Sequence, residues 1–123
     1  MSEHSDRQPA DLIPLSPQVF HILVALAGGD LHGYAIMQEV VARSGGKLRL
    51  SPGTLYGSIK RLLEQGAIAE LSDRERPAGP GEDERRRYYR LTHFGRGVAK
   101  AEAARLAESL EQARVYGLAP ELP

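Results

Sequence analysis

The stretch SPGTLYGSIKRLLEQG, residues 51 to 66, decides the fold. A serine followed by a proline is a typical helix start, and the glycine that closes the stretch is a typical helix stop. Apolar residues recur at helical spacing and form the inward stripe Leu55, Ile59, Leu62 and Leu63. The side turned outward then comprises Gly53, Gly57, Lys60, Arg61 and Glu64, with Thr54 and Ser58 at its flank. The spacing therefore predicts an amphipathic helix with one small-residue and basic side left exposed.

Two more helices are predicted before this one. The first begins at Ser16-Pro17 and keeps a helical apolar spacing until Gly28. The second covers about residues 31–44 and ends at a pair of glycines. Only the four residues KLRL separate it from Ser51, so the second and third helices form a candidate helix-turn-helix.

After Gly66 the pattern changes from helical spacing to alternation. AIAELS and RRRYYRLT have the alternation or the aromatic and threonine content of strands. Between them DRERPAGPGEDE, residues 73–84, is rich in proline, glycine and charge, as hairpin tips are. A hairpin of this kind after a helix-turn-helix predicts a wing.

A last, alanine-rich helix follows from the cap Thr92 to about Tyr116. Its apolar residues step by four, three, four and three as Ala99, Ala103, Leu106, Leu110 and Ala113. A core this small cannot cover the whole seam, so we expect the helix of a second copy to cover it.

The predicted fold is mainly α with a small β-hairpin: a winged helix-turn-helix domain plus a C-terminal dimerisation helix. The predicted boundaries are a flexible N-terminal arm over 1–14, the winged domain over 15–92, the dimerisation helix over 93–116 and a tail over 117–123. At 123 residues the chain has room for one modest core.

Composition narrows the function. The 16 basic and 16 acidic residues cancel, but residues 40–62 carry five cations and no acid, so a basic face is predicted despite the zero net charge. The absence of cysteine excludes disulfides and thiolate catalysis. No apolar run suits a membrane span or a signal peptide, which predicts a cytoplasmic protein with no membrane partner.

Three segments in order carry a family resemblance: LHGYAIMQEV at 31–40, SPGTLYGSIKRLLEQGAIAE at 51–70 and RRRYYRLTHFGR at 85–96. Together they resemble the PadR family of winged helix-turn-helix transcriptional regulators, over nearly all of the chain from Leu15 to about Ala113. The resemblance implies a homodimeric repressor that binds DNA through its N-terminal domain. The matching motif positions are Tyr34, Gly53, Thr54, Leu55, Tyr56, Tyr88, Tyr89, Leu91, Thr92 and Gly95. Many members have a proline where this chain has Gly57, and this is the one departure from the family motif in the third helix.

A helix that enters the major groove needs small or flexible side chains at base edges and cations near phosphates. The residues predicted to contact DNA are Tyr34, Ser51, Gly53, Thr54, Tyr56, Ser58, Lys60, Arg61, Arg85, Arg86 and Arg87. Each has a plainer interpretation: Ser51 as a helix cap only, the tyrosines as core, Lys60 and Arg61 as a solvated face, and the arginine run as a hairpin balanced by its own acids.

Two other kinds of site can be judged from the sequence: a metal or catalytic site and a small-molecule pocket. The four histidines lack the paired spacing of zinc ligands, and no catalytic motif is present, so neither a metal, a cofactor nor an enzyme is expected. Phe20, Phe94 and Tyr116 form a candidate pocket for a small-molecule effector, with aromatic packing as the alternative.

The function predicted from sequence is a sequence-specific DNA-binding transcriptional regulator. It would bind double-stranded DNA at a pseudo-palindromic operator as a homodimer, act as a repressor and respond to an effector. The alternative is a winged-helix protein-protein interaction module without DNA binding.

Overall fold

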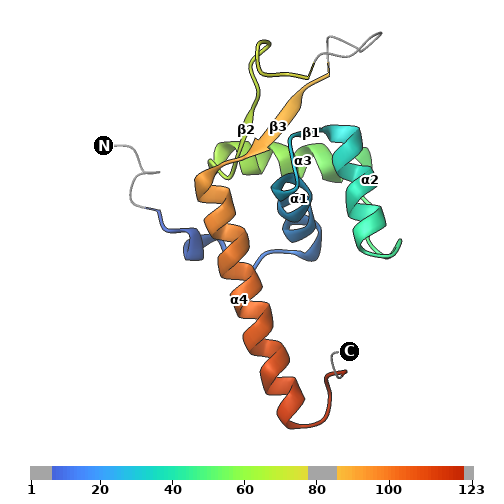
Figure 1. Ribbon diagram of the computed structural model, residues 1–123, viewed down its shortest axis with the longest axis vertical. Coiled ribbons are helices and arrows are strands. Elements are labelled where there is room, and N and C mark those ends of the chain that lie inside the picture. Colours follow the sequence, from blue (N-terminus) through green and yellow to red (C-terminus); the bar gives the residue numbers. More distant parts are fainter. Residues whose placement is uncertain (1–6, 78–85, 121–123) are drawn as a thin grey trace.

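The computed structural model describes residues 7–77 and 86–120 (Figure 1). The elements, in chain order, are η2 (Pro9–Leu12), α1 (Pro17–Ala27), β1 (Leu31–His32), α2 (Gly33–Arg43), α3 (Pro52–Glu64), β2 (Ile68–Glu70), β3 (Tyr88–Leu91) and α4 (His93–Val115). Helices α1, α2 and α3 lie together in the body, β2 and β3 rise above these helices in the view, and α4 extends away from the body on the other side (Figure 1). The predicted class, mainly helical with a small antiparallel sheet, is confirmed.

The predicted helix starts are confirmed at atomic detail. The side-chain oxygens of Ser16, Ser51 and Thr92 each accept a hydrogen bond from the backbone N–H three residues further on, at 2.9 to 3.2 Å. His32 caps α2 in the same way, because its Nδ1 accepts from the Ala35 N–H at 3.2 Å. These bonds satisfy N–H groups that the first turn of a helix leaves free.

The second helix starts two residues later than its spacing predicted. Leu31 and His32 form β1, which pairs antiparallel with β3 so that Leu31 lies opposite Tyr89. Strand β3 also pairs antiparallel with β2, with Ile68 opposite Leu91, and the sheet order is β1-β3-β2. A strand of two residues is too short to show alternation, so only its tertiary pairing reveals it.

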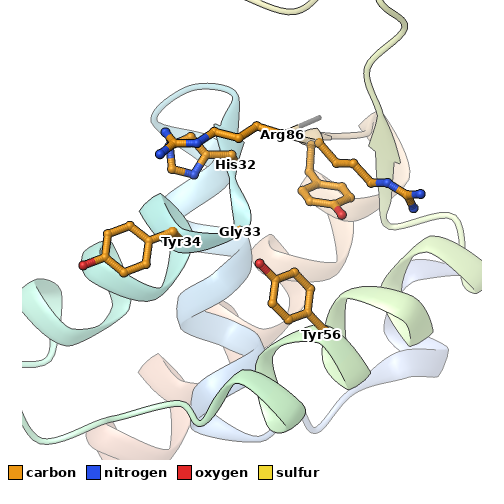
Figure 2. A pocket seen from close by; sticks show the side chains of 7 residues that line it. His32, Gly33, Tyr34, Tyr56 and Arg86 are labelled. Atoms are coloured by element: carbon orange, nitrogen blue, oxygen red, sulfur yellow. The ribbon is translucent and has the colours of Figure 1, made fainter. Parts of the chain in front are cut away.

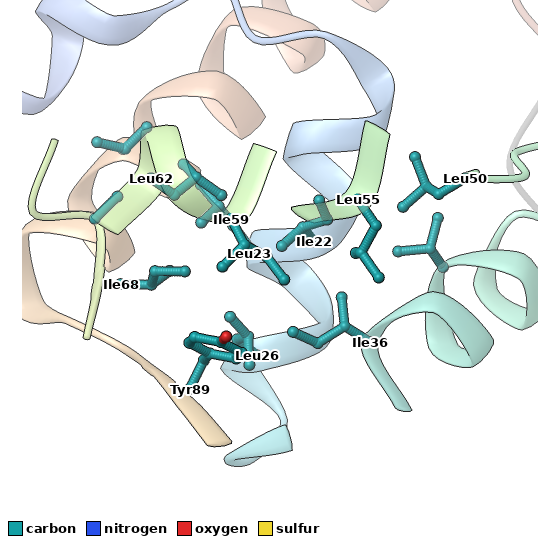
Figure 3. Packing of buried hydrophobic residues seen from close by; sticks show 13 residues of the cluster. Ile22, Leu23, Leu26, Ile36, Leu50, Leu55, Ile59, Leu62, Ile68 and Tyr89 are labelled. Carbon is teal, nitrogen blue, oxygen red and sulfur yellow. The ribbon is translucent and has the colours of Figure 1, made fainter. Parts of the chain in front are cut away.

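The core forms between the three helices and the inner face of the sheet (Figure 3). The stripe predicted on α3 is buried at Leu55, Ile59 and Leu62, while Leu63 is half-buried. The other members are Ile22, Leu23, Leu26, Ile36, Val40, Leu50, Ala67, Ile68, Tyr89 and Val98. Because α3 is held through this stripe, its opposite side remains at the surface.

The described part of the N-terminal arm is more regular than its sequence predicted. Residues Pro9–Leu12 form a 3₁₀ helix that packs against the first turns of α4 (Figure 1). A Cβ added at Gly97 would lie 2.9 Å from Pro9 Cγ, so the glycine permits the close approach. Leu12 and Leu15 pack against the core. Residues 9–15 are therefore docked on the body.

Helix α4 packs on the body through its first three turns. Gly95, Val98 and Glu102 are its buried residues. A Cβ added at Gly95 would overlap the Ala67 carbonyl oxygen, so this turn needs glycine in order to sit against the backbone that leads into β2. None of the helices in the described part of the chain is long and apolar enough to cross a membrane.

Candidate nucleic-acid interface

The outer side of α3 is an exposed surface of small and basic side chains. Gly53, Thr54, Lys60 and Arg61 are all exposed. Among the described residues, no ion pair and no side-chain hydrogen bond engages Lys60 or Arg61, so both charges are available to a polyanion. Ser51, the cap of the helix, also donates from its hydroxyl to the Thr54 hydroxyl at 3.0 Å.

Ser58 does not belong to this surface. Its relative exposure is 3%, and it lies among the buried residues of α3. The reason is helical geometry: position 58 is three residues after Leu55 and four before Leu62, so it shares their face. The prediction that Ser58 contacts DNA is wrong for the protein in this conformation.

Tyr34 and Tyr56 are surface residues rather than core residues. They are 55% and 52% exposed, which rules out the alternative that both are core aromatics. Tyr56 reaches from α3 toward the start of α2, where a Cβ added at Gly33 would lie 2.6 Å from its hydroxyl oxygen (Figure 2). Gly33 is thus the position that lets the Tyr56 ring lie against α2.

The wing brings arginines to the same end of the molecule. Arg86 lies beside His32, with its Nη1 3.1 Å from the ring Nε2 (Figure 2). Arg87 is largely exposed and 3.9 Å from a Glu70 carboxylate oxygen. Arg85 and the acids at 82–84 lie outside the described residues, so the self-balanced hairpin remains untested.

Arg90 is a wing cation that is neutralised within the chain. It contacts both carboxylate oxygens of Asp30, at 2.9 and 3.3 Å, and a Glu75 oxygen at 3.1 Å. The hydrogen bond and charge of Asp30 raise the pKa of Arg90 above its usual value. Arg90 therefore ties β3 to the α1–β1 link and is not available to phosphate.

A cleft of about 330 Å³ joins these elements. It is lined by His32, Gly33, Tyr34, Tyr56, Arg86, Arg87 and Tyr89. Polar and aromatic groups from α2, α3 and the wing converge here, next to the exposed side of α3 (Figure 2). The structure thus brings together Tyr34, Tyr56, Arg86 and Arg87 from the predicted set.

His32 is the member of this cleft that sequence reasoning missed as a site residue. Its ring caps α2 through Nδ1, packs edge-on against Tyr88 at 5.3 Å between ring centroids, and faces Arg86 through Nε2. The only sequence signal is its place directly before Gly33 and Tyr34, at the start of the predicted second helix.

The predicted effector pocket is not formed within one chain. Phe94 stands in the first turn of α4 and Tyr116 follows its last residue. Twenty-two residues of helix separate them by roughly 33 Å at 1.5 Å per residue. Phe94 instead packs against the core with Pro9 nearby, and Tyr116 is 79% exposed. A single cavity lined by Phe20, Phe94 and Tyr116 is therefore a wrong prediction for the protomer.

The predicted dimer seam is largely uncovered. Leu106 and Leu110 are 41% and 40% exposed, and Ala103 is exposed, whereas Ala99 and Ala113 are half-buried.

Over the described residues, no group of three or more histidine, aspartate or glutamate side chains is placed to hold a metal ion.

Comparison with known proteins assigns the family. The pattern of the Transcriptional regulator PadR-like family matches residues 22–101, about two thirds of the chain. The chain belongs to the PadR-like family. Members of this family are transcriptional regulators, and the resemblance drawn from the three sequence segments is confirmed.

Two solved structures share the fold of this PadR-like protein. A transcriptional regulator from Clostridium thermocellum is similar with a TM-score of 0.66 and 25% identity, over 80% of this chain and 88% of that one. A PadR family transcription regulator from Clostridium difficile has a TM-score of 0.65 and 22% identity, over 82% of this chain and 98% of that one.

A sequence relative comes from a mobile element. An uncharacterized 37.1 kDa protein in transposon TN4556 of Streptomyces fradiae is 37% identical over 86 residues, which is 70% of this chain. The match covers 22% of that protein's length.

Proposed function

We propose that this PadR-like chain is a homodimeric repressor that binds a pseudo-palindromic operator. Family membership supports a DNA-binding transcriptional regulator. The observation that carries the finer proposal is the outer side of α3, where Lys60 and Arg61 are exposed and unpaired among the described residues, next to a cleft that carries Arg86 and Arg87.

The proposed contacts follow from this arrangement. The N-terminal half of α3 presents Gly53, Thr54 and Tyr56, which are small or hydroxylated and suit base edges and phosphate oxygens in the major groove. Lys60 and Arg61 neutralise phosphates, and the wing arginines reach the adjacent backbone. Two copies related by a two-fold axis would place their α3 helices about 34 Å apart on successive turns of one duplex face.

The test is selection of bound duplexes from a random pool at near-physiological salt, followed by affinity measurements over a range of salt. We expect an inverted repeat whose half-sites are spaced by one helical turn or a multiple of it. Lys60→Gln with Arg61→Gln should lower affinity and reduce the slope of log affinity against log salt by about 2 per protomer. Repression would be tested by transcription from a promoter that carries the selected site.

The matched control removes two cations from another element: Arg96→Gln with Lys100→Gln on α4. This variant should keep its DNA affinity within about twofold, because neither residue lines the cleft or lies on α3. If wild-type protein selects no duplex and shows no salt-dependent retention, the interaction-module alternative takes precedence.

A further inference from the structure

A second cavity, of about 380 Å³, lies where η2 meets the first two turns of α4. Its lining residues are Pro9, His93, Phe94, Arg96, Gly97 and Lys100. No residue of α3 or of the wing contributes to it, so it is separate from the surface proposed to meet DNA. Its volume falls in the range of small-molecule sites.

The floor of this cavity is apolar and fixed in place. Pro9 sits directly over Gly97, whose missing side chain gives the proline ring room. Phe94 is half-buried and anchored against the core. An apolar group that enters the cavity therefore meets a preformed surface rather than a mobile side chain.

The rim of the cavity is basic. His93, Arg96 and Lys100 follow one another at intervals of three and four residues and so line one side of α4. None of them has an ion pair or side-chain hydrogen bond with the described part of the chain. Arg96 and Lys100 therefore bring two positive charges to the rim, and no acid among the described residues forms an ion pair with either of them.

We infer that this cavity binds a small amphiphilic anion. The apolar part of the ligand lies against Pro9 and Phe94, and its carboxylate accepts hydrogen bonds from Arg96 and Lys100. Charge-assisted hydrogen bonds of this kind are among the strongest polar contacts. A DNA phosphate would satisfy the cations but leave the apolar floor unfilled, so the combination favours an amphiphile over nucleic acid.

The cavity is placed to influence the rest of the molecule. Pro9 begins the segment that runs through Leu15, whose backbone N–H donates to the buried Glu102 carboxylate, and then enters α1. Binding of the anion does not depend on the proposed DNA function. A change in DNA affinity when the anion binds does rest on that proposed function.

The test uses three probes with the same tail: octanoate, octanol and octylamine, each titrated into the full chain by calorimetry. We expect octanoate to bind, octanol to bind at least about tenfold more weakly, and octylamine to show no measurable binding. Arg96→Gln with Lys100→Gln should weaken octanoate by about tenfold or more. Lys60→Gln with Arg61→Gln should bind octanoate like wild type while it loses DNA affinity.

Three results would each overturn the inference. The first is equal binding of octanoate and octanol, and the second is octanoate binding that the Arg96 and Lys100 substitutions leave unchanged. The third is no octanoate binding; a loss of DNA affinity in the Arg96 and Lys100 variant would then make this face a phosphate contact. Because octanoate binding is measured without DNA, a failed operator selection would leave this test intact.

Discussion

At the scale of single residues, the glycines of the helices have opposite roles. A Cβ added at Gly57 of α3 would have nothing within 4 Å. A Cβ added at Gly95 of α4 would overlap the backbone carbonyl of Ala67. Gly57 therefore lowers the stability of its helix with no packing reason within the chain, whereas Gly95 is required for packing.

Gly57→Ala is therefore expected to raise the free energy of unfolding by about 0.5–1 kcal/mol, since alanine loses less backbone entropy in a helix and meets no neighbour. Gly95→Ala, the same chemical change, should lower it by about 3 kcal/mol, because the backbone in its way cannot move cheaply. Urea denaturation followed by circular dichroism measures both values. Equal effects of the same sign at the two positions would contradict this account.

Residue-level prediction from the sequence succeeded where local chemistry decides the outcome. The serine and threonine caps need only a side-chain oxygen and the next turn of helix, so their roles could be inferred from spacing. Ser58 shows an error of another kind: its spacing from Leu55 and Leu62 already places it on the buried face, but its polar side chain favoured an outward prediction.

At the scale of elements, α4 is joined to the rest of the chain by a buried carboxylate. Glu102 is 2% exposed, accepts two hydrogen bonds from Arg105 at 2.6 and 2.8 Å, and also accepts from the Leu15 N–H. The Arg105 hydrogen bonds, helped by the one from Leu15, hold the pKa of Glu102 below its usual value of 4.5 despite burial. The ionised form is thus the one that stabilises the fold.

We expect Glu102→Gln to lower the free energy of unfolding by about 1–3 kcal/mol at neutral pH. Because the folded-state pKa is lowered, the carboxylate's contribution is fully present above about pH 4.5 and is lost as the pH falls through the folded-state value. The difference between wild type and variant should therefore shrink toward about pH 3. Urea titrations at both pH values measure it.

Glu108→Gln provides the control for this experiment. Glu108 is an exposed acid of the same helix, and its substitution should change the free energy of unfolding by less than about 0.5 kcal/mol at either pH. A Glu102→Gln difference that stays constant with pH would show that the charge of the carboxylate does not stabilise the contact.

Glu102 also explains why part of the element arrangement was beyond sequence reasoning. An acid in an alanine-rich helix is normally predicted to be solvated, and nothing local indicates that Leu15 and Arg105 will enclose it. The same holds for η2, whose position depends on the bare surface at Gly97. Helices α1, α3 and α4 were predictable because each repeats its apolar spacing over several turns.

At the scale of the whole molecule, α4 presents one side to the chain's own body and another that we propose for assembly. Gly95, Val98 and Glu102 face the chain's own body, while the seam at 99, 103, 106, 110 and 113 lies about 70° around the helix from them. The second half of α4 extends beyond the body, and within the described residues Leu106 and Leu110 of its seam remain about 40% exposed (Figure 1). A second copy of the chain, packed through the same residues, would bury the seams of both copies.

Leu110→Glu tests this assembly with little risk to the fold, because Leu110 is 40% exposed and outside the core. In a two-fold dimer the change removes two buried leucines and places two like charges at the interface, so the dimer dissociation constant should rise at least about 100-fold. Sedimentation velocity over a concentration series measures this dissociation constant, and unfolding is monitored separately.

Ala104→Glu is the control for this experiment. It adds the same charge at an exposed position about 120° around the helix and should leave assembly unchanged. Operator affinity should fall with dimer stability, because the second half-site is then bound without the linkage that two joined domains provide. A Leu110→Glu protein that sediments like wild type would place the dimer interface elsewhere.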